Sequence, residues 1–180
     1  MKIFGIDPGS ERTGYGCVER IGGRQRLVVC GSLSGPSRAA FPEKLKAIHS
    51  GLQALFARHH PDSVAVETIF HARNVRSALK LGHARGVVLL AASEAGLPVL
   101  EYAPAEIKRA VVGYGRAEKY QVQQMVGLLL GLDAPPAPHD VADALAVAIC
   151  HLQNAAGTLA DRIRSEHPPG VLRSWRDYRP

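Results

Sequence analysis

The feature that most constrains this chain lies at its start, where a short apolar strand ends on an aspartate and is broken at once by Pro-Gly. Lys2–Asp7 is the strand and Pro8–Ser10 is the break. Thr13–Glu19 and Leu27–Leu33 have the composition of two further strands, with a Gly-Gly turn at 22–23 between them. Three strands joined by such short connections predict an antiparallel meander.

The rest of the chain alternates between helices and strands. Phe41–Arg58 and Val75–Ala95 carry apolar residues at helical spacing, while Ser63–Glu67 and Leu97–Glu101 are short strands. Three more helices are predicted, over Pro104–Val112, Lys119–Leu130 and His139–Ala155. Strands separated by long helices need crossover connections and therefore lie parallel. The sequence predicts an α/β fold: a mixed five-stranded sheet, three antiparallel strands followed by parallel ones, flanked by helices.

Composition and length favour a single domain with a tail. The 180 residues, 46% of them hydrophobic, can form a core without disulfides or a structural metal. We expect one domain over residues 1–156 and a basic, flexible tail over 157–180, where arginines outnumber acids. The motifs GxxxxGK[ST], HExxH and GxSxG do not occur in the sequence, so P-loop, zincin and hydrolase-elbow chemistry have no support.

Cysteine usage and hydropathy indicate the compartment. The three cysteines at 17, 30 and 150 form no CxxC pair, which argues against a zinc ribbon or a disulfide framework. From the first residues, Met1–Asp7, we expect no secretory leader, and the longest apolar run, Val87–Ala92, is far too short to span a membrane. We expect a reduced, cytoplasmic protein without a membrane partner.

Two acids end apolar strands. Asp7 follows the first strand, and Glu67 ends the strand Ser63–Glu67. Each has an ordinary interpretation on its own, Asp7 as turn chemistry before Pro-Gly and Glu67 as a solvated strand end. If the two strands are neighbours, however, about 4.8 Å separates their backbones and both carboxylates can serve one site.

Two more acids begin the last predicted helix. Asp140 and Asp143 are three residues apart and therefore share a helix face. Either can be explained as helix capping or as a favourable partner of the helix dipole. Because the helix is apolar nearly all round beyond its first turn, it should be buried, and its start should reach the rim of the domain.

Taken together, the four acids predict a metal site. Carboxylates gathered in one place repel each other unless divalent cations separate them, and such oxygen ligands suit Mg²⁺ or Mn²⁺. Two ions about 3.5–4 Å apart could clamp both oxygens of a phosphodiester displacement. The chain has 22 bases and 16 acids; without these four, 12 acids remain and the surround carries +10. An acidic site on a basic surface is what a metal-dependent nuclease needs.

The sequence also resembles a known family. Its opening segment Gly5–Gly16 is similar to the start of the RuvC-type Holliday junction resolvases, and the match runs in order through about residues 1–155. The other matching segments are Val66–Phe70, Ser77–Gly82, Val111–Gly113, Ala117–Lys119 and Asp140–Ala146. The resemblance implies a ribonuclease-H-like fold, a homodimer and paired nicking of four-way DNA junctions with two Mg²⁺ (or Mn²⁺) ions per active site. It also implies partners of the junction-binding and branch-migration motor type (RuvA and RuvB type).

The resemblance further assigns roles to individual residues. Asp7, Glu67, Asp140 and Asp143 match the family's acidic ligands. The family has Asp or His at the third acidic position, so His139 is a possible ligand, although the spacing to Asp143 selects Asp140. Lys108 and Lys119 match lysines near the scissile phosphate, where a cation would stabilise developing charge. The aromatic at the position of Phe70 stacks on bases at the junction.

A basic segment follows Glu67. The candidate DNA-binding residues here are Phe70, Arg73, Asn74, Arg76 and Lys80, with Arg109 and Arg116 further along the chain. Arg85 belongs to the same acid-free run. A solvated helix face is the ordinary alternative, and a phosphate track is our hypothesis. Small residues recur at 78, 82 and 86, which predicts a close-packed neighbour on that side, and a second subunit could be this neighbour.

Three other functions share parts of this pattern. The segment Gly5–Gly9 followed by Thr13-Gly14 also resembles the phosphate hairpin of actin-like ATPases and sugar kinases, but those proteins enclose ATP between two such domains. A junction-binding protein without catalysis is a second alternative. A related nuclease acting on RNA or on other DNA is the third.

Overall fold

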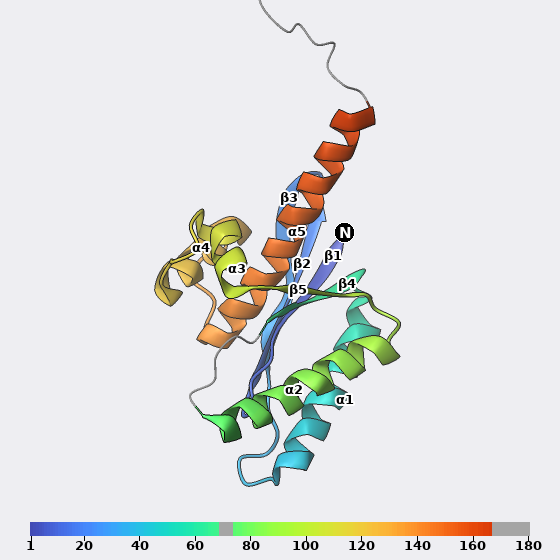
Figure 1. Ribbon diagram of the computed structural model, residues 1–180, viewed down its shortest axis with the longest axis vertical. Helices are drawn as coiled ribbons and strands as arrows, with labels where there is room; N and C mark the ends of the chain where they lie inside the picture. The colour runs from blue at the N-terminus through green and yellow to red at the C-terminus, as the bar shows by residue number, and fades with distance from the viewer. Residues whose placement is uncertain (69–73, 167–180) are drawn as a thin grey trace, which may run out of the picture.

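The structure is a computed structural model that describes residues 1–68 and 74–166, the last eleven by backbone alone. This part of the chain folds into a five-stranded sheet with five helices packed on its two faces (Figure 1). The strands are β1 (Lys2–Asp7), β2 (Thr13–Ile21), β3 (Arg24–Leu33), β4 (Ser63–Glu67) and β5 (Val99–Tyr102). The helices are α1 (Phe41–His59), α2 (Val75–Glu94), α3 (Pro104–Val112), α4 (Lys119–Leu130) and α5 (His139–Glu166).

The sheet has the order β3-β2-β1-β4-β5, with β1 at its centre. β1 pairs antiparallel with β2 and parallel with β4, and β4 pairs parallel with β5. The predicted meander and the parallel strands after it are therefore confirmed. Since β1 and β4 are parallel neighbours, with Ile6 opposite Val66, their carboxyl ends reach the same edge of the sheet.

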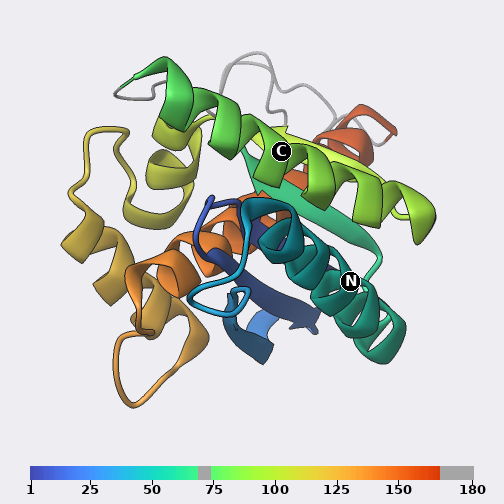
Figure 2. The same cartoon turned by 90° about the horizontal axis from the view of Figure 1, so that it is seen from below.

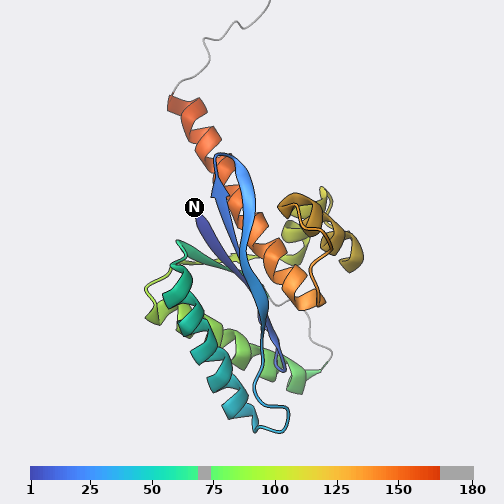
Figure 3. The ribbon, with the colours of Figure 1, turned by 180° about the vertical axis from the view of Figure 1, so that it is seen from behind.

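Alternation along the strands divides the core into two layers. Phe4, Ile6 and Val66 belong to the cluster that packs under α1 and α2. Ile3 and Ala65 belong to the cluster under α5. Successive side chains of a strand point to opposite faces, so Asp7 and Glu67 lie on the α5 face. Figures 2 and 3 show α1 and α2 side by side on one face of the sheet, and α5 with α3 and α4 on the other.

Three glycines let α5 lie unusually close to the sheet. A Cβ atom on Gly5 would come 2.0 Å from the carbonyl oxygen of Ala144, and one on Gly14 would come 2.1 Å from that of Asp140. A Cβ on Gly16 would lie 2.4 Å from the side chain of Leu145. At these positions a larger residue would push the helix off the sheet, so the glycines fix where the first turns of α5 sit.

Several element boundaries differ from the expected ones, among them the start of β5 and the end of α5. β5 begins at Val99 rather than Leu97, since Pro98 has no N–H to donate to a ladder. α5 continues through Gly157 to Glu166 rather than ending at Ala155, and Pro168 and Pro169 follow shortly after its end. Of the described helices, none is both long enough and apolar enough to cross a membrane.

Candidate active site

Four carboxylates from three elements meet at one edge of the sheet. Asp7 is the last residue of β1, Glu67 is the last residue of β4, and Asp140 and Asp143 lie in the first turns of α5. Their proximity shows in the pKa of Asp7, which burial and the neighbouring charges of Asp143, Glu67 and Asp140 raise to about 7. Acids 60 to 136 positions apart in the sequence are thus electrostatic neighbours in the fold.

Glu67 experiences the same environment. Burial and the charge of Asp143 raise its pKa, while Lys119 and Lys108 oppose the rise. Burial comes first in this balance, because a carboxylate removed from water loses hydration that only a cation or hydrogen-bond donors can replace. The two acids at the strand ends therefore carry an excess of negative charge that the protein's own lysines offset only in part.

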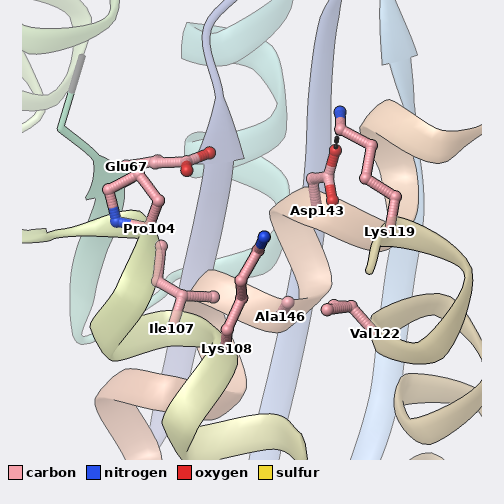
Figure 4. Close-up of a pocket in the computed structure, with 8 residues that line it drawn as sticks. All are labelled: Glu67, Pro104, Ile107, Lys108, Lys119, Val122, Asp143 and Ala146. Carbon is pink, nitrogen blue, oxygen red and sulfur yellow. Dashed lines mark hydrogen bonds and ion pairs between the residues drawn. The ribbon is translucent and has the colours of Figure 1, made fainter. Parts of the chain in front are cut away.

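A pocket opens beside these carboxylates. It is lined by Glu67, Pro104, Ile107, Lys108, Lys119, Val122, Asp143 and Ala146. Figure 4 shows the polar groups of Glu67, Lys108 and Asp143 directed into the same space, above an apolar wall from α3, α4 and α5. Both lysines that the sequence singles out thus lie with two of the acids in one pocket.

Lys119 is the cation nearest the acids of α5. Its Nζ donates to Oδ2 of Asp143 at 3.1 Å (Figure 4). Asp143, and more weakly Asp7 and Glu67, raise the pKa of Lys119, so this amine stays protonated. The position of Lys119 is set locally: it is the first residue of α4, whose start is stabilised by a reciprocal capping box between Glu118 and Gln121.

The donor set suits a divalent metal ion. All four acids offer hard oxygen ligands, the kind that Mg²⁺ and Mn²⁺ prefer. Oδ2 of Asp140 is buried and has no hydrogen-bond partner within the described residues, and its nearest cation, Nε of Arg12, is 4.0 Å away. Within the described residues, no group of three or more His, Cys, Asp or Glu side chains is already arranged to hold a metal ion. The charge and the donor chemistry of the four acids thus fit a divalent cation, and Lys119, Lys108 and Arg12 are the positive side chains beside them.

His139 directly precedes Asp140 in the sequence. It is exposed at the start of α5, and it is not one of the groups that shift the pKa of Asp7. The exposed Arg109 and Arg116 lie on α3 and just before α4, the two helices that contribute Lys108 and Lys119 to the pocket.

The predicted DNA-binding segment is described in part. Phe70 and Arg73 lie outside the described residues. Asn74 is the N-cap of α2, where its side chain accepts a hydrogen bond from the backbone of Ser77 at 2.8 Å. Arg76 is exposed on the first turn of α2. The amine of Lys80 lies 5.6 Å from the ring centre of Phe41 on α1.

Two arginines contact acidic residues that the sequence did not pair with them. Arg85 belongs to the basic run, yet it points inward and contacts Glu67 and Glu101 rather than forming part of an exposed track. The sequence signal alone, a basic residue in an acid-free helix, does not distinguish these two situations. Arg12 has no role assigned from the sequence, and it faces Asp140. Its place in the short loop after Asp7 is the signal that could have indicated it.

The fold and the site together define a class. A mixed sheet in this order, with acids at the ends of its two central parallel strands and on the helix that covers them, is the architecture of ribonuclease-H-like nucleases. The family model described as crossover junction endodeoxyribonuclease RuvC matches residues 3–151. The chain belongs to the RuvC family.

Relatives and solved structures agree with this assignment. The crossover junction endodeoxyribonuclease RuvC of Chloroflexus aggregans is 52% identical over 155 residues, which cover 86% of this chain and 94% of that protein. The structure of Thermus thermophilus RuvC in complex with a Holliday junction substrate is 38% identical, with a TM-score of 0.83, and covers 88% of this chain and 96% of that one. A yeast mitochondrial Holliday junction resolvase, 12% identical with a TM-score of 0.55 and covering 87% of this chain and 85% of its own, shares the fold.

Proposed function

We propose that this chain is a structure-selective endonuclease that resolves four-way (Holliday) DNA junctions in recombination and repair, by metal-dependent hydrolysis of phosphodiester bonds on two symmetric strands. The observation that carries the proposal is the group of acids around Asp7, where burial and the charges of the neighbouring carboxylates raise the pKa of Asp7 to about 7. Such a group beside two lysines, in a member of the RuvC family, favours phosphodiester hydrolysis.

We assign the acids to metal binding. Asp7, Glu67, Asp140 and Asp143 would hold two divalent ions, Mg²⁺ or Mn²⁺, and His139 is a possible further ligand. Such ions activate water and stabilise the leaving oxygen of a phosphodiester. Lys108 and Lys119 lie in the same pocket, where their charge can stabilise the negative charge that develops on the phosphate.

We assign DNA binding to the basic residues around this site. Arg73, Arg76 and Lys80 would contact phosphates on one side, with Asn74 beside them, and Arg109 and Arg116 on the other. Phe70 would stack on a base at the opened crossover, a contact worth about 1–3 kcal/mol per base. The exposure of Arg76, Arg109 and Arg116 supports this assignment, since a phosphate contact needs an accessible cation.

We propose that the active form is a homodimer built on α2. Val75, Leu79 and Leu90 are 77%, 61% and 51% exposed on this helix, and added Cβ atoms at Gly82 and Gly86 would meet nothing within 4 Å. The small residues therefore have no close neighbour within the described chain, and a second copy could approach them closely. A two-fold dimer presents two acidic sites to two equivalent strands.

The location and further partners follow from the substrate. An enzyme that cuts recombination junctions works where the DNA is, which supports the cytoplasmic location that the cysteines indicate. Junction-binding and branch-migration proteins of the RuvA and RuvB type act on the same DNA structure, so we place them as its functional partners.

The test is cleavage of an end-labelled four-way junction with Mg²⁺, with Mn²⁺ and with EDTA. We expect paired nicks only with metal, and loss of cleavage by at least about 100-fold in Asp7→Asn, Glu67→Gln and Asp143→Asn, because each change removes a charged metal ligand. Junction affinity in EDTA should change little. Near-normal cleavage by any one variant would remove that acid from the site.

The same assay separates the alternatives. A non-catalytic junction-binding protein would retain the junction on a gel and leave it uncut under every metal condition. ATP turnover by the purified protein would instead favour an actin-like ATPase or a sugar kinase. Cleavage of linear duplex or RNA at the rate seen with the junction would indicate a related nuclease of different specificity.

A further inference from the structure

We infer that Arg85 is a positioning residue that holds Glu67 in place through the main chain of β4, an inference that rests on the proposed function. Nη1 of Arg85 donates to the carbonyl oxygen of Glu67 at 2.8 Å. Nη2 of the same guanidinium lies 2.5 Å from Oε2 of Glu101 on β5. One side chain thus connects the end of the strand that carries a candidate ligand with the neighbouring strand.

The contact acts at the point where the sheet gives β4 the least support. Glu67 is the last residue of the strand. On one side the backbone N–H of Thr68 donates to the carbonyl of Tyr102 at 2.9 Å. From the middle of α2, Arg85 reaches back to the carbonyl of Glu67 itself. Strand ends fray readily, and these two contacts restrain the Cα position from which the Glu67 carboxylate projects.

Arg85 does not act by neutralising the Glu67 carboxylate. The cations that lower the pKa of Glu67 are Lys119 and Lys108, which face it across the pocket. Arg85 binds the carbonyl on the backbone instead, so its effect on Glu67 is one of position. Misplacement of a reacting or ligating group by about 1 Å can cost about 100-fold in rate.

Burial argues against the alternative role of Arg85 as a phosphate contact. Its side chain is 16% exposed, and both guanidinium nitrogens named above already have partners. Arg76, on the first turn of the same helix, is exposed and provides the matched control. A bidentate arginine cannot be replaced by lysine without losing one of its two contacts, so Arg85→Lys should be intermediate.

The experiment compares Arg85→Met, Arg85→Lys, Glu101→Gln and Arg76→Met with the wild type. Three quantities are measured: single-turnover cleavage at saturating junction, junction affinity in EDTA, and binding of Mn²⁺ to the DNA-free protein by electron paramagnetic resonance. Thermal melting identifies which variants fold and a temperature at which those variants are folded, and their assays are run there. Arg85→Lys and Glu101→Gln keep the side-chain volume, so the comparison holds even if Arg85→Met does not fold.

We expect Arg85→Met to slow cleavage about 10–100-fold and weaken Mn²⁺ binding about 3–10-fold, with junction affinity within about 2-fold of wild type. Arg85→Lys should recover part of both losses, and Glu101→Gln, which keeps the contact to Glu67, should lose less than about 3-fold. Arg76→Met should weaken junction affinity and leave Mn²⁺ binding unchanged.

Two results would overturn the inference. One is wild-type Mn²⁺ binding and cleavage in Arg85→Lys and Arg85→Met. The other is a loss of junction affinity in these variants as large as the loss of rate, which would make Arg85 a DNA contact. If the wild type itself does not cut junctions, the proposed function fails, and the Mn²⁺ measurement still decides whether Arg85 positions Glu67.

Discussion

At the residue scale, Asp7 carries the clearest physical signature of the site. It is mostly buried, and three other carboxylates surround it, so its ionised form is costly in the absence of metal. The same repulsion is what would make a divalent cation bind, since the cation replaces carboxylate–carboxylate repulsion with attraction. Lys119 offsets part of this carboxylate repulsion through its hydrogen bond to Asp143.

The raised pKa of Asp7 predicts how the metal-free protein responds to pH. Its pKa rises from 3.8 in the unfolded chain to about 7 in the folded one, so between these values the folded state binds more protons. Stability therefore falls as pH rises through this window and levels off above about 7. In EDTA, Asp7→Asn should melt about 5 °C above wild type at pH 8, and the gap should close toward pH 4.

The comparison with the variant isolates Asp7 from other titrating groups. Burial lowers the pKa of His151, which contributes with the opposite sign below about pH 6.5, but it does so equally in both proteins. Mg²⁺ at pH 8 should raise the melting temperature of the wild type and leave Asp7→Asn almost unchanged. A constant gap across the pH range would show that Asp7 is not perturbed.

At the element scale, the position of α5 on the sheet decides whether Asp140 and Asp143 reach the site. Helix and sheet each follow from local pattern, but their close approach depends on the glycines of β1 and β2. Gly14 lies opposite Asp7 in the β1–β2 register, and its missing side chain leaves room for the Asp140 backbone. One residue thus relates two elements that each carry a candidate ligand.

Gly14→Ala should therefore damage stability and activity together. The added Cβ would come 2.1 Å from the Asp140 carbonyl oxygen, so the first turn of α5 must move. We expect a loss of about 1–3 kcal/mol of stability by urea unfolding, and cleavage reduced at least about 10-fold under folded conditions. The matched control is Gly127→Ala in α4, where the nearest atom would be 3.4 Å away. This control should be neutral or slightly stabilising, and equal losses in both variants would exclude the close-approach explanation.

At the scale of the whole molecule, the exposed apolar face of α2 predicts self-association. Leu79→Asp places a charge on that face, so it should shift the protein to monomers in sedimentation velocity and convert paired cutting into single nicks. Leu128→Asp on α4 is the control, since Leu128 is 74% exposed on a different helix. If Leu128→Asp dissociates the protein and Leu79→Asp does not, the interface lies elsewhere.

The charge distribution predicts a steep dependence of junction binding on salt. The surround of the four acids carries ten net positive charges, from 22 bases and 12 remaining acids. If about six phosphates are contacted, affinity should fall about 1,000-fold between 50 and 200 mM salt. Binding titrations in EDTA at several salt concentrations measure the slope, and a flat response would contradict a phosphate track.

The sequence by itself determined the order and type of the elements, the antiparallel and parallel directions of the strands, and the identity of the four acids. The elements and strand directions follow from local periodicity and from the lengths of the connections, and the acids from their positions and from the resemblance to the RuvC family. The tertiary structure decided the rest: that α5 approaches Gly14 closely, that Arg85 turns inward to Glu67 while Arg76 stays exposed, and that Lys119 pairs with Asp143. These outcomes depend on contacts between elements distant in sequence. The sequence pattern around a basic helix residue does not show whether its side chain will be buried or exposed.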